Sequence, residues 1–182
     1  LFNALNAVYF QIDESNKAPR RTLEMISELL RYQLYGGNQK VSILQEIDYL
    51  KTYIALRKLR MSERLRLRVE FPPELNELNI YPLLFLPLVE NAFKYVGGDY
   101  QLDIIMKWEN NRISLFIRNS IPELSAEDEA LRKSVDERQR KGIGLVNLRR
   151  RLSLLYPNKH RLETRKEETE FVAELMIEIE DI

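Results

Sequence analysis

The sequence contains no cysteine, which excludes disulfides and thiolate chemistry and fits a reducing compartment. Basic and acidic residues balance at 28 each, so the overall charge does not predict nucleic-acid binding, and we expect none. The longest apolar run, around Ile80 to Val89, is interrupted by Pro82 and Pro87 and is shorter than the roughly 20 residues that span a bilayer. No signal peptide is recognisable. A length of 182 residues suits one compact domain with an accessory element.

The first part of the chain has helical periodicity. Apolar residues recur at three- and four-residue spacing, at Leu1, Leu5, Val8 and Ile12 and again at Leu23, Ile26 and Leu30. Ser42 and Gln45 match a capping box, which predicts that a third helix begins there. Its apolar stripe is typical either of an amphipathic helix packed on its neighbour or of a helical dimer interface. The chain begins at Leu1, without Met and within a helical pattern, so we expect it to be an excised piece of a longer protein.

From Leu65 the period changes to strict alternation, which predicts β-strands. Alternating segments run from Leu65 to Phe71, from Leu102 to Trp108, from Ile113 to Ile117 and from Phe171 to Ile179, with a further strand expected near Arg161 to Arg165. Asn110-Asn111 is a plausible hairpin turn between two of them. With helices expected at about 82–96 and 144–155, the fold class is α+β: a two-layer sandwich with a mixed sheet and helices on one face.

Residues 81–96 place three polar residues, Glu90, Asn91 and Lys94, in an otherwise apolar helical segment. Helical spacing lets them converge on one target, and we expect them to be buried, where they need a ligand or metal as partner. Asn offers a neutral oxygen for Mg²⁺, Glu can orient a water or accept a proton, and Lys is a point cation for phosphate. The alternative for Glu90 and Asn91 is a satisfied pair of hydrogen bonds at a helix end.

Two glycines, Gly142 and Gly144, precede an amphipathic helix. They allow a backbone turn to approach phosphate, and the positive end of the helix would face it, although the start of a helix often needs such a turn by itself. The polar stretch from Ser120 to Lys141 is long for a connection within a domain. It is either a lid over a bound nucleotide or a passive loop, with Ser125 as a possible cap of a short helix.

The segment around Glu90 and Asn91 resembles an N box, and residues 141–149 resemble its glycine-rich companion. The pair is similar to the Bergerat-type ATP-binding domain (GHKL, HATPase_c) of gyrase, Hsp90, MutL and histidine kinases. Residues 1–6, 29–32 and 53–60 resemble further blocks of the LytS/YehU-type sensor histidine kinases. The resemblance implies a partial helical dimerisation and phosphoacceptor region at 1–62 and an ATP-binding catalytic domain at 63–182.

In that family a histidine accepts the γ-phosphoryl group of ATP and passes it to an aspartate of a response regulator. The motif places this histidine just upstream of Leu1, and we expect His160, the only histidine, to be an ordinary surface residue. The resemblance further implies a homodimer through the N-terminal helices and a location on the cytoplasmic side of the inner membrane, with membrane anchoring only through segments absent from this sequence. This piece is expected to bind Mg-ATP without phosphorylating itself.

The resemblance also implies individual roles. Asn91 would bind Mg²⁺, and Glu90 would polarise the attacking imidazole or a water. The nucleotide would be bound by Asn91, Lys94, Tyr95, Asn119, Lys141, Gly142, Ile143, Gly144, Leu145 and Asn147. One departure is Asn119, which stands where kinases of this fold carry the aspartate of D-x-G-x-G, the acceptor for the adenine amino group. An amide oxygen can accept this bond but lacks the charge that strengthens it.

Two alternatives from other classes remain. One is a conformational ATPase of the gyrase, Hsp90 or MutL type, in which water is the acceptor. The other is a non-catalytic module that dimerises and docks a response regulator while its pocket binds nucleotide weakly or not at all. Asn119 favours the second alternative. The retained set counts against it, namely Glu90, Asn91, Lys94, Gly142 and Gly144.

Overall fold

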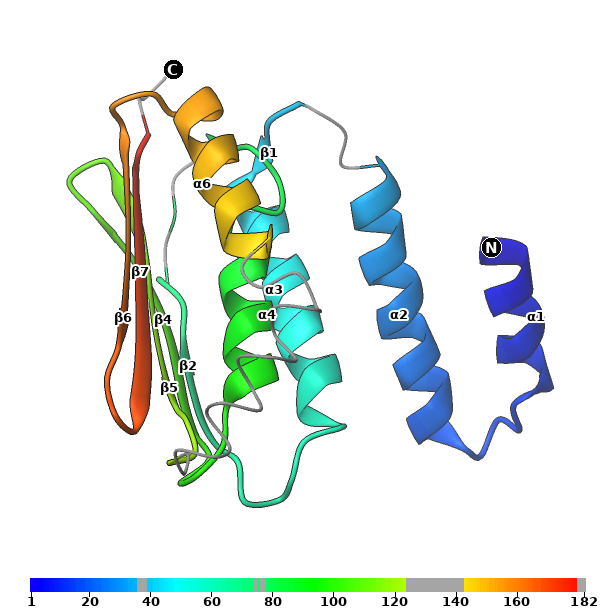
Figure 1. Ribbon diagram of the computed structural model, residues 1–182. Coiled ribbons are helices and arrows are strands. Elements are labelled where there is room, and N and C mark those ends of the chain that lie inside the picture. The colour runs from blue at the N-terminus through cyan, green and yellow to red at the C-terminus, as the bar shows by residue number, and fades with distance from the viewer. Residues whose placement is uncertain (36–38, 74, 76–77, 124–142, 180–182) are drawn as a thin grey trace. The chain divides into compact units, whose positions relative to one another are not determined.

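The structure is a computed structural model that describes residues 1–35, 39–73, 75, 78–123 and 143–179. It contains two compact units (Figure 1). The first comprises Leu1–Met61 with Asn79–Leu83, and the second comprises Ser62–Leu78 with Leu84–Ile182. The chain therefore returns to the first unit for one short segment after it has begun the second.

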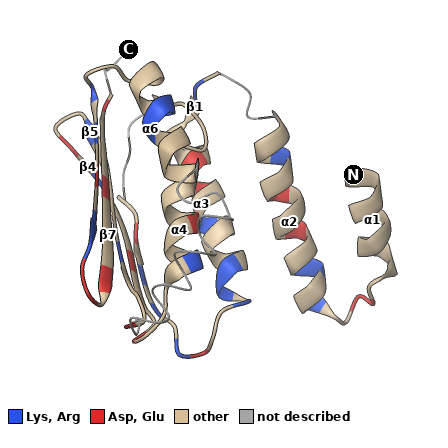
Figure 2. Cartoon of the chain, in the orientation of Figure 1, with Lys and Arg blue, Asp and Glu red and all other residues tan. Residues whose placement is uncertain are grey.

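Three helices build the first unit: α1 (Phe2–Gln11), α2 (Lys17–Tyr35) and α3 (Ile43–Lys58). The predicted capping box is confirmed, because the Leu44 N–H donates to Ser42 Oγ at 3.3 Å and the Ser42 N–H donates to Gln45 Oε1 at 3.1 Å. The short strands β1 (Val41–Ser42) and β3 (Asn79–Ile80) pair antiparallel. Along α2 two acidic residues, Glu24 and Glu28, lie between basic residues on either side (Figure 2), as expected for a helix with a solvated face.

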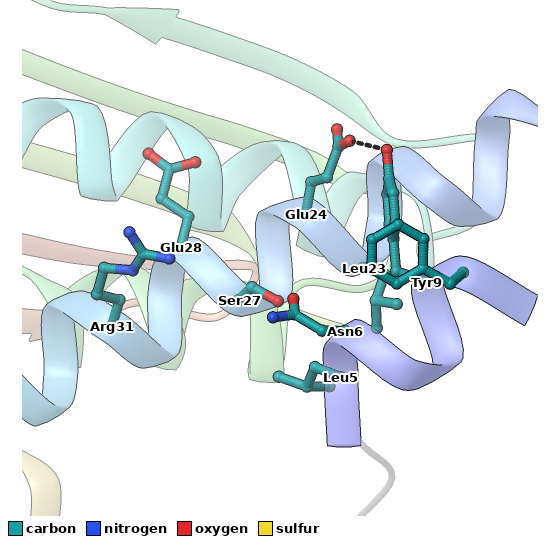
Figure 3. Close-up of a pocket in the computed structure, with 9 residues that line it drawn as sticks. Leu5, Asn6, Tyr9, Leu23, Glu24, Ser27, Glu28 and Arg31 are labelled. Atoms are coloured by element: carbon teal, nitrogen blue, oxygen red, sulfur yellow. Dashed lines mark hydrogen bonds between the residues drawn. The ribbon is translucent and has the colours of Figure 1, made fainter. Parts of the chain in front are cut away.

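A shallow pocket lies between α1 and α2, lined by residues that include Leu5, Asn6, Tyr9 and Leu23 (Figure 3). The Tyr9 hydroxyl donates to the Glu24 carboxylate at 2.9 Å, and this hydrogen bond raises the pKa of Tyr9. None of the residues of α1 is buried. The two helices are therefore held by a few exposed contacts rather than by a shared core.

The second unit contains a five-stranded sheet in the order β2-β4-β5-β7-β6. Its strands are β2 (Arg66–Glu70), β4 (Gln101–Glu109), β5 (Arg112–Ser120), β6 (His160–Lys166) and β7 (Glu170–Glu178). The pair β2–β4 is parallel and the other pairs are antiparallel, so the sheet is mixed as predicted. Asn110 and Asn111 form the expected hairpin turn, with φ values of 51° and 60° that match the left-handed conformation such turns require.

Helices α4 (Leu86–Tyr95) and α6 (Ile143–Leu155) cover one face of this sheet (Figure 1). They bury Leu88, Val89, Ala92, Phe93, Leu148 and Leu152 over the sheet residues Leu102, Ile104, Ile113, Leu115 and Ile117. The predicted α+β class with helices on one face is confirmed. The helix expected from residue 82 begins only at Leu86, because Leu83 has a left-handed φ of 58° and Pro87 occupies the first turn, where proline is tolerated.

Candidate functional site

Helix α4 carries the predicted N-box residues on its solvent side. Glu90 and Lys94 are exposed and Asn91 is half-buried, so the expectation that all three are buried is wrong for Glu90 and Lys94. The reason is that the apolar residues of α4 take the side that packs on the sheet and leave the polar residues on the other. The Lys94 ammonium lies 5.0 Å from the ring centroid of Tyr95, which is half-buried.

Asn119 lies near the end of β5 and is fully buried. It has the same place in the strand alternation as Ile113, Leu115 and Ile117, so its side chain is on the helix-covered face. Its Nδ2 donates to the Ser120 carbonyl at 3.3 Å, whereas its Oδ1 has no hydrogen-bond partner among the described residues. Buried polar oxygens are almost always satisfied, so this oxygen marks a position where an outside donor would be stabilised.

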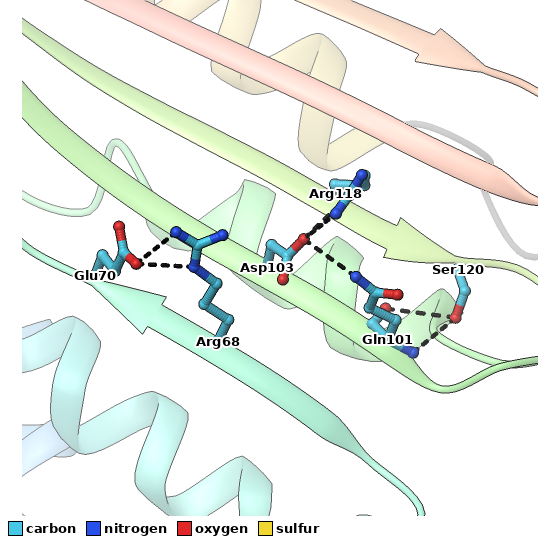
Figure 4. Close-up of polar contacts among 6 residues, drawn as sticks. All are labelled: Arg68, Glu70, Gln101, Asp103, Arg118 and Ser120. Atoms are coloured by element: carbon cyan, nitrogen blue, oxygen red, sulfur yellow. Dashed lines mark hydrogen bonds and ion pairs between the residues drawn. The ribbon is translucent and has the colours of Figure 1, made fainter.

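Ser120, at the end of β5, forms hydrogen bonds with the segment that follows α4. Its hydroxyl donates to the Gly97 carbonyl at 2.6 Å and accepts from the Gln101 N–H at 2.9 Å, and the Gly97 N–H donates to the Ser120 carbonyl at 3.0 Å. Figure 4 shows Ser120 beside Gln101 at the end of the strand. A Cβ at Gly97 would lie 2.9 Å from Pro122 Cδ, so the close approach requires glycine. This contact was not predicted from the sequence, in which the Gly97-Gly98 pair is its local signal.

The other face of the sheet carries charged residues together with apolar ones such as Ile105 and Phe116. Arg118 Nη2 on β5 lies 2.6 Å from Asp103 Oδ2 on β4, and this hydrogen bond raises the pKa of Arg118 (Figure 4). Arg68 makes a similar pair with Glu70 at 2.7 Å, exposed to solvent. Arg112 on β5 and Glu178 on β7 form a further pair on this face, with Nη2 2.6 Å from Oε1. Asn119 lies on the opposite, helix-covered face.

The glycine-rich segment is described only in part. Lys141, Gly142 and nearly all of the expected lid, with Ser125, lie outside the described residues. Ile143 begins α6, and Gly144, Leu145 and Asn147 follow in its first turns; Gly144 and Asn147 are exposed and Leu145 is half-buried. A Cβ at Gly144 would meet nothing within 4 Å. Packing within the described residues therefore does not require glycine at this position.

These site residues come from elements that contact one another, since α4 packs on β5 and on α6.

The described residues contain no group of three or more His, Cys, Asp or Glu able to hold a metal ion. His160 is half-buried at the start of β6, and its Nδ1 lies 2.7 Å from the Tyr156 carbonyl. None of the described helices is both long and apolar enough to cross a membrane.

Residues 1–65 match the family model described as histidine kinase. The sensor protein kinase HptS of Staphylococcus aureus (strain USA300) is 27% identical over 167 residues, which cover 89% of this chain and 32% of HptS. The chain thus spans about a third of the length of the curated relatives it matches.

The solved structures that resemble this one include MprB and ShkA. The mycobacterial sensor histidine kinase MprB has a TM-score of 0.51 at 13% identity, covering 80% of this chain and 99% of that chain. ShkA, solved at full length in complex with AMPPNP, has a TM-score of 0.52 at 12% identity, covering 87% of this chain and 35% of that chain. At these identities the likeness shows the fold alone. The matched family model and the likeness to HptS thus show that the chain is similar in sequence to sensor histidine kinases.

Proposed function

We propose that residues 63–182 bind Mg-ATP and form the catalytic part of a two-component sensor kinase. The unsatisfied Oδ1 of buried Asn119 carries this proposal. It stands at the position where the family motif has the acceptor for the adenine amino group. Because Nδ2 already donates to the Ser120 carbonyl, the amide is oriented with its oxygen available as an acceptor.

Helix α4 supplies the groups for the phosphate end of the nucleotide. Asn91 offers a neutral amide oxygen, a ligand type that suits Mg²⁺, which is commonly bound by one or two protein groups together with phosphate oxygens. When bound, Mg²⁺ neutralises charge on the phosphate oxygens. Lys94, exposed beside Tyr95, is available to a phosphate oxygen, and Glu90 would polarise the attacking imidazole.

Helix α6 would face the phosphates with its N-terminus, where backbone N–H groups are available to an anion. Gly144 is consistent with this role, since the described residues give no packing reason for glycine there. Lys141, Gly142, Ile143, Leu145 and Asn147 complete the proposed nucleotide-binding set. The AMPPNP in the ShkA structure is consistent with a nucleotide at this fold, although the shared identity is low.

The phosphoryl group would go to a histidine that the family motif places just upstream of Leu1, and from there to an aspartate of a response regulator. The N-terminal helices would form a homodimer in the whole protein, which would be membrane-anchored with this part on the cytoplasmic side. The match to HptS, a sensor protein kinase, supports these assignments.

Calorimetric titration with Mg²⁺ and a nonhydrolysable ATP analogue tests the proposal, with Asn91→Ala measured in parallel. We expect the parent chain to bind and the variant to bind at least about tenfold more weakly, which corresponds to about 1.4 kcal/mol. Lys107→Ala, an exposed change on β4 away from α4, serves as the control and should bind like the parent. Absence of heat from a folded parent chain would contradict the proposal and favour a non-catalytic module that docks a response regulator.

A further inference from the structure

Helices α2 and α3 of the first unit are joined by buried contacts at one end and leave a groove between them at the other. Where α2 finishes and α3 starts, Leu29 and Leu50 are buried. There the Tyr32 hydroxyl and the Leu83 N–H donate to Glu46 Oε2, at 2.6 and 2.9 Å. By contrast, residues 17–28 and 55–61, at the other end, are all exposed or half-buried. The space between the two helices is therefore open where α2 starts and α3 finishes.

The groove at this open end has a volume of about 530 Å³. Its floor includes Ala18 and Met25 of α2 and Ala55 and Leu59 at the end of α3. The alanine side chains are too short to close the space between two neighbouring helices, so the floor stays accessible. Leu59 is 62% exposed, which leaves most of its apolar surface available to a partner.

Basic side chains surround this groove. Lys17 and Arg21 line it, and Lys58 and Arg60 flank Leu59 in the sequence; all four basic residues are exposed. Figure 2 shows basic residues in the first turns of α2 and in the last turn of α3. None of the four forms an ion pair within the part of the chain that the structure describes. A partner that enters the groove therefore meets an apolar floor with a positively charged rim.

Helix stability gives no reason for the positive charge at the start of α2. Lys17 is the first residue of this helix, Arg21 lies one turn later, and the first turn contains no acidic residue. The N-terminus of a helix carries a partial positive charge, so a basic residue there is unfavourable. Lys58, in the last turn of α3, is at the favourable end of its helix. An acidic group bound beside Lys17 would offset the unfavourable charge at the start of α2.

The shape and charge of the groove select among possible partners. A second copy of the chain in a two-fold contact would place the same basic rim against itself, which is repulsive. Single-stranded nucleic acid binds on aromatic side chains that stack with its bases, and the described lining of the groove contains none. A bilayer surface is broad, whereas this apolar floor lies between two helices. An amphipathic helix with acidic flanks fits both the floor and the rim.

We propose that this groove docks an acidic amphipathic segment of another protein. Apolar side chains of the segment pack on Ala18, Ala55 and Leu59, and its carboxylates lie beside Lys17 and Arg21. The apolar contacts supply affinity, and the charges select acidic segments and reject basic ones. The groove lies within the first unit, so this inference does not depend on nucleotide binding by the second.

The test titrates the 182-residue chain into a fluorescein-labelled synthetic peptide and measures fluorescence anisotropy. The peptide forms a helix with leucine along one face and glutamate on the others. A second peptide has lysine in place of every glutamate. We expect the chain to bind the glutamate peptide and not the lysine peptide. Added salt should weaken this binding, because the ionic contacts are exposed to solvent.

Two pairs of variants locate the binding, and circular dichroism verifies that each is folded. Leu59→Gln should weaken binding of the glutamate peptide at least about fivefold, because it removes apolar contact. Leu34→Gln is its matched control, since Leu34 is 60% exposed in the last turn of α2, and it should bind like the parent. Lys17→Glu should weaken binding about threefold or more without lowering the melting temperature, because an acidic residue suits the start of a helix. Lys107→Glu, on β4, is the control for charge and should leave binding unchanged.

The alternative occupants give different results. Equal binding of the two peptides, or equal loss of binding in Leu34→Gln and Leu59→Gln, would overturn the proposal. So would sedimentation that shows self-association of the chain, weakened by Leu59→Gln, together with no peptide binding; the groove would then belong to a second copy. Binding to phosphatidylglycerol vesicles without binding of the glutamate peptide would assign the groove to a membrane surface and likewise overturn the proposal.

Discussion

Asn119→Leu should stabilise the ligand-free protein and abolish nucleotide binding. Asn119 is fully buried, and its Oδ1 has no hydrogen-bond partner among the described residues. Leucine has a similar volume and would place apolar atoms beside Ile117 on the helix-covered face of β5. The Ser120 carbonyl would lose the Asn119 donor but retain the Gly97 N–H at 3.0 Å. The substitution therefore removes a buried unsatisfied oxygen without creating another.

The magnitude follows from these contacts. A buried unsatisfied polar group costs about 1–3 kcal/mol, whereas the long 3.3 Å bond from Nδ2 contributes about 0.5 kcal/mol, at the low end for hydrogen bonds. The net gain in unfolding free energy is therefore about 0.5–2.5 kcal/mol, before any packing adjustment. For a chain of this size, each kcal/mol raises the melting temperature by about 2–4 °C. We expect a rise of about 1–10 °C.

Thermal unfolding followed by circular dichroism measures the change in melting temperature. Titration with Mg²⁺ and a nonhydrolysable ATP analogue measures the loss of nucleotide binding. Ile117→Val, on the same strand and face, is the matched control: it should lower unfolding free energy by about 0.5–1.5 kcal/mol and leave nucleotide affinity unchanged. Most substitutions destabilise a protein, so a rise in melting temperature is a stringent test. A lower melting temperature for Asn119→Leu, with nucleotide affinity retained, would refute the reasoning about Oδ1.

Three further predictions concern the hydrogen bond between Ser120 and Gly97, the pKa of Asp13 and phosphotransfer to histidine. Ser120→Ala should lower unfolding free energy by about 1–3 kcal/mol in urea titrations, because the Gly97 carbonyl loses the 2.6 Å bond from the Ser120 hydroxyl; an unchanged midpoint would contradict this. Hydrogen bonds from Ser15 lower the pKa of Asp13. The ionised Asp13 carboxylate therefore stabilises the fold above the ordinary aspartate pKa, and this contribution is lost as the pH falls through the lowered pKa of Asp13. Carbon-detected NMR titration should show this lowered pKa, and Ser15→Ala should raise it. Incubation with radiolabelled ATP should leave no acid-labile phosphohistidine on the chain; label at His160 would argue against the proposed acceptor.

Local patterns predicted the secondary structure well. The alternating segments form β2, β4, β5 and β7, and the further strand expected near Arg161 to Arg165 is β6. The Asn110-Asn111 turn and the Ser42 capping box formed as expected. These features are determined by neighbours in the sequence, because a strand's alternation, a two-residue turn and a helix cap depend on residues a few positions apart. The same patterns led to the mixed sheet with helices on one face.

Prediction of the candidate site was less complete. The sequence identified Glu90, Asn91, Lys94 and Asn119 as residues of interest, but wrongly expected Glu90 and Lys94 to be buried. The spacing of polar residues in the sequence shows that they share one side of a helix. It does not show whether that side faces the sheet or the solvent. The left-handed backbone at Leu83, which delays the start of α4, also has no clear local signal.

The sequence by itself determined the type and approximate limits of most elements, and the motifs by which the chain resembles the sensor histidine kinases. Only the tertiary structure decided that Asn119 is buried with an oxygen that has no partner in the described part of the chain, and that Ser120 bonds to Gly97 at the end of the sheet. It alone joined Tyr32, Glu46 and Leu83. Such contacts link residues far apart in the chain, and their geometry depends on how whole elements pack, which no local pattern encodes.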